Sequence, residues 1–399
     1  TLTNYDRLGR VSSIDRPAGV GEWNLDFTYD AISRKRKTVA TTDSVYSDAW
    51  EYDDYGRVKR QIRSYTDTLV MDFEYDLLGR RTKIYYPSNE SSVSYVYQGA
   101  YLKQVCRGDD FCASAPQLDG LVTDVLYDDL GRRTDTVTSE GTVHREYYGI
   151  APVLGGSVNA LKRLAITVGN EAGALDFNYQ YDSIGNITNI VDQSTTYDAS
   201  ATYTYDTRNR LESWTDAAGT QKWYSYDALG NLKGHGAASL SDADFNQTFD
   251  TATKPHQITQ NRIGEGYAYD ADGNIIQRGL TEFFVYDSAN RLVCTGGAPG
   301  KCDGPGYRYD ADGQLMWDGA AGQLLMGELF KWQSSGSVAY SNVAAFGAFA
   351  VAGMLALMMK SDGDDRTATP APPPGPAPTV ALRLIWWQVL AIALGPSRH

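Results

Sequence analysis

The chain has 399 residues and a formal net charge of −13, and aromatic residues make up 12% of it. Disordered chains lack such an aromatic content, so most of the chain is expected to fold. The acidic balance argues against a nucleic-acid partner, because binding to phosphates requires clustered Lys and Arg. The chain begins at Thr1 without an initiator Met, which predicts a piece of a longer protein.

A tyrosine-centred unit recurs from the first residues onward. It reads YDRLGRV at 5, YDDYGRV at 52, YDLLGRR at 75, YDDLGRR at 127, YDSIGNI at 181, YDALGNL at 226 and YDADGNI at 269. The marked Tyr stands at positions 5, 29, 52, 75, 97, 127, 181, 205, 226, 269, 286 and 309, with weaker units at Tyr148 and Phe249. The mean step between these 14 marks is about 23 residues, which is typical of repeat architectures.

Each unit begins with the pattern of a β-strand. An aromatic residue usually stands two positions before the marked Tyr, as Phe27 does before Tyr29 and Trp50 before Tyr52. This alternation places the aromatic residues on one face of a strand, whereas a helix would not keep them on one side. Aromatic residues also favour strands over helices.

A turn and a return strand follow the marked Tyr. The Asp accepts local backbone hydrogen bonds, and the Gly three residues later permits a positive φ. Each unit therefore predicts one β-hairpin. Because a single hairpin is marginally stable, the hairpins are expected to join into one sheet that covers its edges by curling into a spiral or closed shell. The predicted fold class is all-β, with a hydrophobic and mostly helical C-terminal tail.

Two close pairs of cysteines lie among the repeats. Cys106 and Cys112 bracket RGDDF, and Cys294 and Cys302 bracket TGGAPGK. The even count and the short loops favour disulfides formed in an oxidising compartment. Free thiols remain an alternative, and a zinc site is a weaker one, because neither pair has C-x-x-C spacing and no His lies nearby.

Motifs for enzymatic chemistry are missing from the sequence. It contains no HExxH, GxSxG or GxGxxG, and its four His are scattered far apart. We therefore predict no catalytic residue, cofactor or metal, and we do not expect an enzyme.

An apolar tail follows the last clear repeat. We place the repeat shell at residues 1–316 and a connector at 317–342. Residues 343–359, from Val343 to Met359, are apolar and just long enough for a transmembrane or membrane-inserting helix, with a buried helix inside the shell as the alternative. A Pro-rich linker at 360–379 precedes a hydrophobic segment at 380–399, interpreted as an interfacial helix or an unselected read-through tail.

The repeated units, together with YDTRNRLESWTDAAGTQKWYSYDALGNL (205–232) and KPHQIT (254–259), resemble the YD repeats of Rhs proteins. The resemblance covers about residues 1–316 and implies a β-sheet wound into a hollow shell. In bacterial Rhs proteins and related polymorphic toxins such a shell encloses a C-terminal toxic domain, and similar shells occur in insecticidal toxin complexes and teneurins. Many Rhs cores end in an Asp-Pro-rich self-cleaving segment, which has no counterpart after Tyr309, so no protease residue is transferred.

These observations lead to a functional hypothesis. The chain is expected to be a non-enzymatic container or carrier of a C-terminal or separate toxin cargo, in a secreted or surface system of the interbacterial competition type. Its expected location is extracellular or at the cell surface. One alternative is a membrane-anchored surface protein whose repeats serve adhesion or carbohydrate binding, with residues 343–359 as the anchor. Another is a truncated remnant without independent activity.

Overall fold

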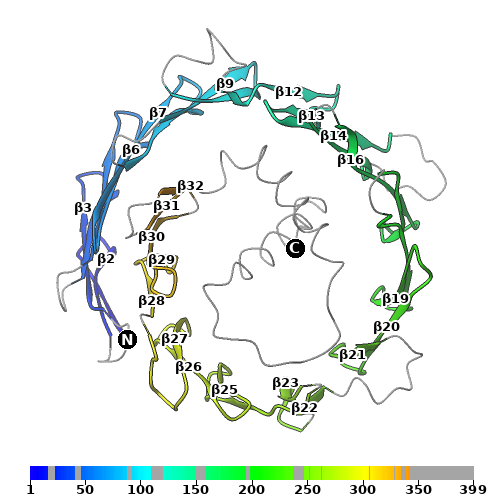
Figure 1. The fold of residues 1–399 in the computed structure, drawn as a ribbon. Coiled ribbons are helices and arrows are strands. Elements are labelled where there is room, and N and C mark those ends of the chain that lie inside the picture. Colours follow the sequence, from blue (N-terminus) through cyan, green and yellow to red (C-terminus); the bar gives the residue numbers. More distant parts are fainter. Residues whose placement is uncertain are drawn as a thin grey trace, which may run out of the picture. The chain divides into compact units, whose positions relative to one another are not determined.

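The computed structural model describes residues 1–16, 23–40, 46–87, 92–108, 120–149, 159–169, 171–194, 198–236, 247–250, 252–261, 263–304, 306–327, 329–333 and 338–340. Over these ranges the regular elements are β-strands, and every pairing recorded between them is antiparallel. The predicted all-β class is confirmed. Figure 1 shows that the strands of each sheet follow one another in chain order.

The first sheet contains 11 strands in sequence order. They are β1 (Leu2–Tyr5), β2 (Val11–Asp15), β3 (Leu25–Tyr29), β4 (Lys35–Ala40), β5 (Ser47–Tyr52), β6 (Val58–Ser64), β7 (Thr68–Tyr75), β8 (Arg81–Tyr85), β9 (Ser92–Gln98), β10 (Tyr101–Arg107) and β11 (Gly120–Val122). Each strand pairs with its sequence neighbours, so the sheet is a meander of consecutive hairpins.

The second sheet contains ten strands, also in sequence order. They are β12 (Asp124–Tyr127), β13 (Arg133–Val137), β14 (Gly141–Tyr147), β15 (Leu161–Val168), β16 (Glu171–Tyr181), β17 (Ile187–Asp192), β18 (Ala201–Tyr205), β19 (Leu211–Asp216), β20 (Gln221–Tyr226) and β21 (Leu232–Gly236).

Three smaller sheets complete the described strands. One pairs β22 (Thr248–Asp250) with β23 (Lys254–Gln260), and one holds β24 (Tyr267–Tyr269), β25 (Ile275–Arg278), β26 (Glu282–Tyr286) and β27 (Leu292–Gly296). The last holds β28 (Tyr307–Tyr309), β29 (Leu315–Asp318), β30 (Gln323–Met326), β31 (Phe330–Gln333) and β32 (Val338–Tyr340). Strands β30 to β32 lie in the segment 317–342, which was expected to be a connector.

The chain divides into two compact units. Among the described residues, the first comprises those within 1–96, 105–119 and 222–340, and the second comprises those within 97–104 and 120–221. In the first unit, Tyr86 stacks on Phe330 at a centroid distance of 5.7 Å, and Tyr65 meets the edge of Trp317 at 5.6 Å. These contacts place the five-stranded sheet against the first sheet within this unit.

The hairpins that carry a Tyr-Asp pair share the same irregularity next to the turn. Tyr29 pairs with Lys35 across five turn residues, and the register shifts by one at the Tyr. The residue three positions after the turn Asp has a positive φ, 84° at Gly56 for example. Ser33, Asn209 and Asn290 occupy this position in three repeats with φ of 60–70°. The turn predicted from Asp and Gly is therefore present.

The C-terminal predictions fall on residues that the structure does not describe. Residues 343–359, the Pro-rich linker at 360–379 and the segment 380–399 all lie outside the described ranges. Among the described residues, no helix has the length and apolarity needed to cross a membrane.

Candidate functional site: a repeated turn and a buried arginine

The carboxylate of the turn Asp organises each hairpin. In the turn at 53–57, Asp53 Oδ1 accepts the backbone N–H groups of Tyr55 and Arg57 at 3.0 and 2.9 Å. Asp53 Oδ2 accepts the Nε–H of Arg57 at 2.6 Å. The same Asp–Arg contact recurs in the turns that begin at Asp6, Asp30, Asp76, Asp128, Asp206 and Asp287. In the turns that begin at Asp182, Asp227 and Asp270, Asn replaces the Arg.

In several turns the arginine also contacts the following hairpin. The Arg34 guanidinium lies 4.4 Å from the ring centroid of Tyr52, and the Tyr52 hydroxyl donates to the Lys35 carbonyl at 2.7 Å. Cation–π contacts and neutral hydrogen bonds each contribute about 1 kcal/mol. The pattern recurs at Tyr29, Tyr75 and Tyr309. The marked tyrosines therefore join neighbouring hairpins.

The turn aspartates predict a loss of stability in acid. Partial burial raises the pKa of Asp53, but hydrogen bonds from the backbone and side chain of Arg57 lower it more, so the net shift is downward. A carboxyl with a lower pKa in the folded state stabilises the fold above its unfolded pKa of about 4, and this contribution is lost as pH falls through the folded pKa. The urea concentration at the unfolding midpoint is therefore expected to decrease when the pH is lowered below about 4.

The neighbouring carboxylate Asp54 provides the control for this prediction. The Asp53→Asn variant is expected to lose stability at neutral pH and to show a weaker acid dependence than the parent chain. Asp54, in the same turn, is exposed, so Asp54→Asn should retain the parent pH profile. Equal profiles for both variants would contradict a role of the turn carboxylate.

The last repeat departs from this pattern. Asp310 Oδ1 accepts the backbone N–H groups of Asp312 and Gln314 at 3.1 and 2.9 Å, as in the other turns. The position of the turn Arg is taken by Gln314, and Asp310 Oδ2 instead accepts a hydrogen bond from Arg63 Nη2 at 2.8 Å. Arg63 lies on β6, 247 residues earlier in the chain.

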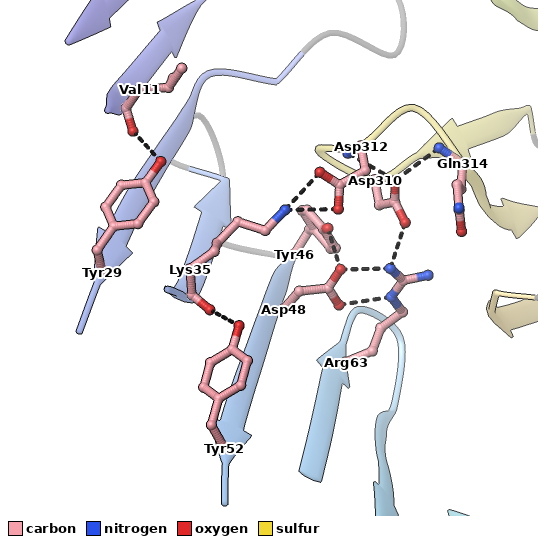
Figure 2. A network of polar contacts seen from close by, with 10 residues as sticks. All are labelled: Val11, Tyr29, Lys35, Tyr46, Asp48, Tyr52, Arg63, Asp310, Asp312 and Gln314. Carbon is pink, nitrogen blue, oxygen red and sulfur yellow. Dashed lines mark hydrogen bonds and ion pairs between the residues drawn. The ribbon is translucent and has the colours of Figure 1, made fainter. Parts of the chain in front are cut away.

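Arg63 is the centre of a buried cluster, shown in Figure 2. It binds Asp48 through Nε at 2.8 Å and through Nη2 at 2.6 Å, and its Nη1 donates to the Leu325 carbonyl at 2.7 Å. The Tyr46 hydroxyl donates to Asp48 Oδ2 at 2.7 Å. The exposed fractions of the Arg63 and Asp48 side chains are 2%, and that of Asp310 is 8%. This cluster connects β5 and β6 with the turn after β28 and with β30.

The protonation states of the cluster follow from its charges. Burial lowers the pKa of Arg63, but the hydrogen bond and charge of Asp48 raise it more, so the net shift is upward. Burial, followed by the charge of Asp48, raises the pKa of Tyr46. The guanidinium therefore stays charged and the phenol stays protonated at neutral pH. Because both carboxylates are bound by Arg63 inside the unit, the arrangement is suited to fastening two sheets together.

The sequence patterns did not single out Tyr46, Asp48 or Arg63. They lie in or beside strands of ordinary sequence, and Arg63 contacts residues more than 240 positions away only through the fold. One signal was present, because Gln314 stands where most other turns have Arg or Asn.

Three of the four cysteines singled out in the sequence lie among the described residues. Cys294, on β27, and Cys302 form a disulfide with a Cα–Cα distance of 5.5 Å. Cys106 is also disulfide-bonded, whereas Cys112 lies outside the described residues. Over the described ranges, no group of three or more His, Cys, Asp or Glu side chains is arranged to hold a metal ion.

Removal of the Cys294–Cys302 bridge is expected to lower the free energy of unfolding by about 2–3 kcal/mol, the loop-closure entropy of a short loop. The measurement is urea unfolding of the Cys294→Ala/Cys302→Ala variant, with and without reductant. Reductant should lower the stability of the parent chain more than that of the variant, whose Cys106 bridge remains. An unchanged midpoint in the variant would contradict this prediction.

Comparisons with known proteins agree with the repeat pattern. Residues 153–325 match the family model of the Teneurin YD-shell, so the resemblance to YD-repeat proteins is confirmed. No curated protein matches the chain.

Three solved structures illustrate the similarity. A crystal structure of TcdB2–TccC3–Cdc42 has a TM-score of 0.46 and 12% identity, covering 84% of this chain and 21% of that one. A Photorhabdus luminescens Tc holotoxin pore with a mutated TccC3 has a TM-score of 0.45 and 15% identity, covering 79% and 19%. TcdB2–TccC3 without its hypervariable C-terminal region has a TM-score of 0.48 and 13% identity, covering 84% and 20%. The chain therefore spans about a fifth of the length of these chains.

Proposed function

We propose that this chain, whose residues 153–325 match the Teneurin YD-shell model, is part of the wall of a container for toxin cargo. The role of the wall is sequestration without catalysis: the hairpins form a barrier, and the cargo stays shielded behind it. The contact between Arg63 and Asp310 supports this role most directly. It fastens strand β6 to a turn 247 residues later, as is required of a sheet that returns to its own beginning.

The cargo and the location extend this proposal. The Rhs-like repeats favour a toxin cargo, either the C-terminal part of this chain or a separate domain, in a system of the interbacterial competition type. Within this proposal the shell extends over residues 1–316, and the segments 317–342, 343–359, 360–379 and 380–399 form the part that follows it. The Cys294–Cys302 disulfide favours a secreted or cell-surface protein.

A protease-accessibility experiment on the full chain tests the container. A recognition site for a sequence-specific protease is placed in the linker at 360–379. A matched site is placed beside Leu280, which is 89% exposed in the turn between β25 and β26. In the folded chain the linker site is expected to resist cleavage, while the turn site is cut rapidly.

The Arg63→Met variant supplies the second arm of this test. If the wall holds the linker inside, loosening the fastening cluster should make the linker site cleavable. Equal cleavage of the two sites in the parent chain would contradict an enclosed C-terminal cargo. If the two sites of the parent chain are cut equally and the chain is recovered in the membrane fraction, the result would instead favour an anchored surface protein.

A further inference from the structure

A row of buried side chains crosses five strands of the second sheet. Strand pairing places its members directly opposite one another, from β12 to β16, so they share one face of the sheet. The members are Val125, Thr136, Val143, Ile166 and Leu175, with exposed fractions of 2%, 5%, 6%, 4% and 4%. We call these five residues the buried row.

The described strands do not account for the burial of this row. In the second unit, strands β12 to β19 all belong to one sheet, and only β11 and part of β10 come from another. An apolar sheet face is normally buried against a second layer of the fold. The low exposure of the row therefore requires a cover that this single layer of strands does not supply.

Arg145 stands beside the row without a partner for its charge. It pairs with Leu164 on β15 and lies two residues after Val143, so it shares their face of the sheet. Among the described residues, its Nη1 is shielded from solvent and has no hydrogen-bond partner, and the same is true of Thr136 Oγ1 in the row. Buried charges in proteins are normally paired. An anion is therefore the partner that suits this site.

The acidic residues on either side of Arg145 are bound on the opposite face. Asp135 Oδ1 lies 2.7 Å from His144 Nδ1, and Glu146 binds Arg163 at 3.0 Å and Lys162 at 3.3 Å. These ion pairs leave Arg145 out. Burial lowers the pKa of Arg145, and a carboxylate brought to the guanidinium would offset this cost.

The C-terminal part of the sequence has the matching composition. The chain continues for 59 residues (399 − 340) beyond Tyr340, where the last described strand ends. Within this part, residues 343–359 form a run of 17 residues without a charged or polar side chain. Acidic side chains occur there only at Asp362, Asp364 and Asp365, beginning three positions after the run. An apolar run followed closely by carboxylates complements an apolar row beside an unpaired cation.

We propose that the buried row and Arg145 form the docking site for residues 343–365 of this chain, which lie outside the described ranges. The apolar run covers the row, and a carboxylate of Asp362, Asp364 or Asp365 binds the Arg145 guanidinium through charge-assisted hydrogen bonds. This inference rests on the proposed function, because it specifies which part of the wall holds a C-terminal cargo.

Protease cleavage in the linker measures this docking in the full chain. A recognition site is placed within 367–379, beyond the three aspartates. Arg145→Met is expected to speed cleavage about tenfold relative to the parent chain, because the carboxylates lose their cation. Arg133→Met removes a neighbouring cation that is exposed and should leave the rate unchanged. Circular dichroism and thermal melting establish that each variant is folded.

Neutralising the acidic side chains tests the other half of the ion pair. The triple variant Asp362→Asn/Asp364→Asn/Asp365→Asn is also expected to speed cleavage about tenfold. Adding Arg145→Met to this variant should give no further increase, because both changes remove the same contact. Effects that multiply in the combined variant would overturn the pairing.

A photoreactive phenylalanine analogue in place of Phe177 tests the apolar half of the site. Phe177 packs against Val143, Ile166 and Leu175 of the row, so irradiation is expected to join it to a residue within 343–365 of the same chain. Crosslinks to another segment or to a second chain overturn the proposal.

Two outcomes of the cleavage assay separate this inference from the proposed function. If the linker is protected in the parent chain and stays protected in Arg145→Met, the docking site is wrong while an enclosed cargo stands. If the linker site and the site beside Leu280 are cut equally in the parent chain, the enclosed cargo fails and the docking site fails with it.

Discussion

Replacement of Arg63 by methionine is expected to lower the free energy of unfolding of the first unit by about 3–5 kcal/mol, the typical cost of breaking a buried ion pair. The substitution keeps an unbranched side chain as far as the position of Nε but leaves Asp48 and Asp310 without the cation that binds both. The Leu325 carbonyl loses its donor as well. Urea unfolding can be followed by tryptophan fluorescence, since Trp317 and Trp332 lie in the sheet that the cluster fastens.

Arg60 provides a matched control on the same strand. It binds Asp72 through two hydrogen bonds at 2.6 and 2.9 Å, but its side chain is 43% exposed. Because solvent screens an exposed pair, Arg60→Met is expected to cost less than about 1 kcal/mol. A loss in Arg63→Met no greater than that in Arg60→Met would show that the cluster does not fasten the two sheets.

Neutralising Asp48 and Asp310 tests why Arg63→Met lowers the free energy of unfolding. In the Arg63→Met/Asp48→Asn/Asp310→Asn variant the three charged groups of the cluster are all neutral. Replacing a buried ion pair with neutral groups is often close to neutral for stability, so most of the loss should be recovered. No recovery would indicate that packing of the Arg63 side chain, not its charge, holds the sheets together.

Replacement of Gly141 by alanine is expected to destabilise the second unit by about 3 kcal/mol, at the upper end of ordinary overpacking. Gly141 begins β14 and pairs with Val168 of β15. A Cβ at this position would lie 2.0 Å from the Thr167 carbonyl oxygen and 3.0 Å from its carbon. Since both are backbone atoms, the β14–β15 pair has to move apart.

Hydrogen exchange of the amides in β14 and β15 measures this effect. Gly149 serves as the control, because a Cβ added there would meet no atom within 4 Å and its φ is not positive. Gly149→Ala should leave exchange unchanged, whereas Gly141→Ala should accelerate it in both strands. The same protection in the two variants would contradict the crowding inferred at Gly141.

The hairpins could be predicted because the residues that form each hairpin lie close together in the sequence. An aromatic residue, Tyr, Asp and Gly follow one another within seven positions, and these residues form both strands and the turn. Ser33 shows the limit of the pattern, because it has a φ of 70° where most repeats have Gly. The Asp30 carboxylate still accepts the backbone N–H groups of Ile32 and Arg34 there, so the turn forms without Gly.

The fastening cluster could not be predicted, because it depends on how distant repeats meet. Asp310 carries the ordinary repeat motif, and its bond to Arg63 spans 247 residues. Likewise, the stacking of Arg34 on Tyr52 requires the hairpins to be neighbours at a fixed distance. The alternation predicts that the aromatic residues share one face of a strand, but it does not reveal that a marked tyrosine such as Tyr52 is partly buried and binds the preceding hairpin.

The contact between Arg63 and Asp310 limits how the number of repeats in this chain can change. Contacts such as Arg34 with Tyr52 join each repeat only to its neighbour, so adding or deleting a whole repeat would preserve every contact of that kind. The bond between Arg63 and Asp310 is different, because it forms only when the intervening chain brings that particular turn to that particular strand. The cluster therefore fixes the number of repeats between Arg63 and Asp310. Insertion of one repeat there should be selected against, even though each repeat folds locally.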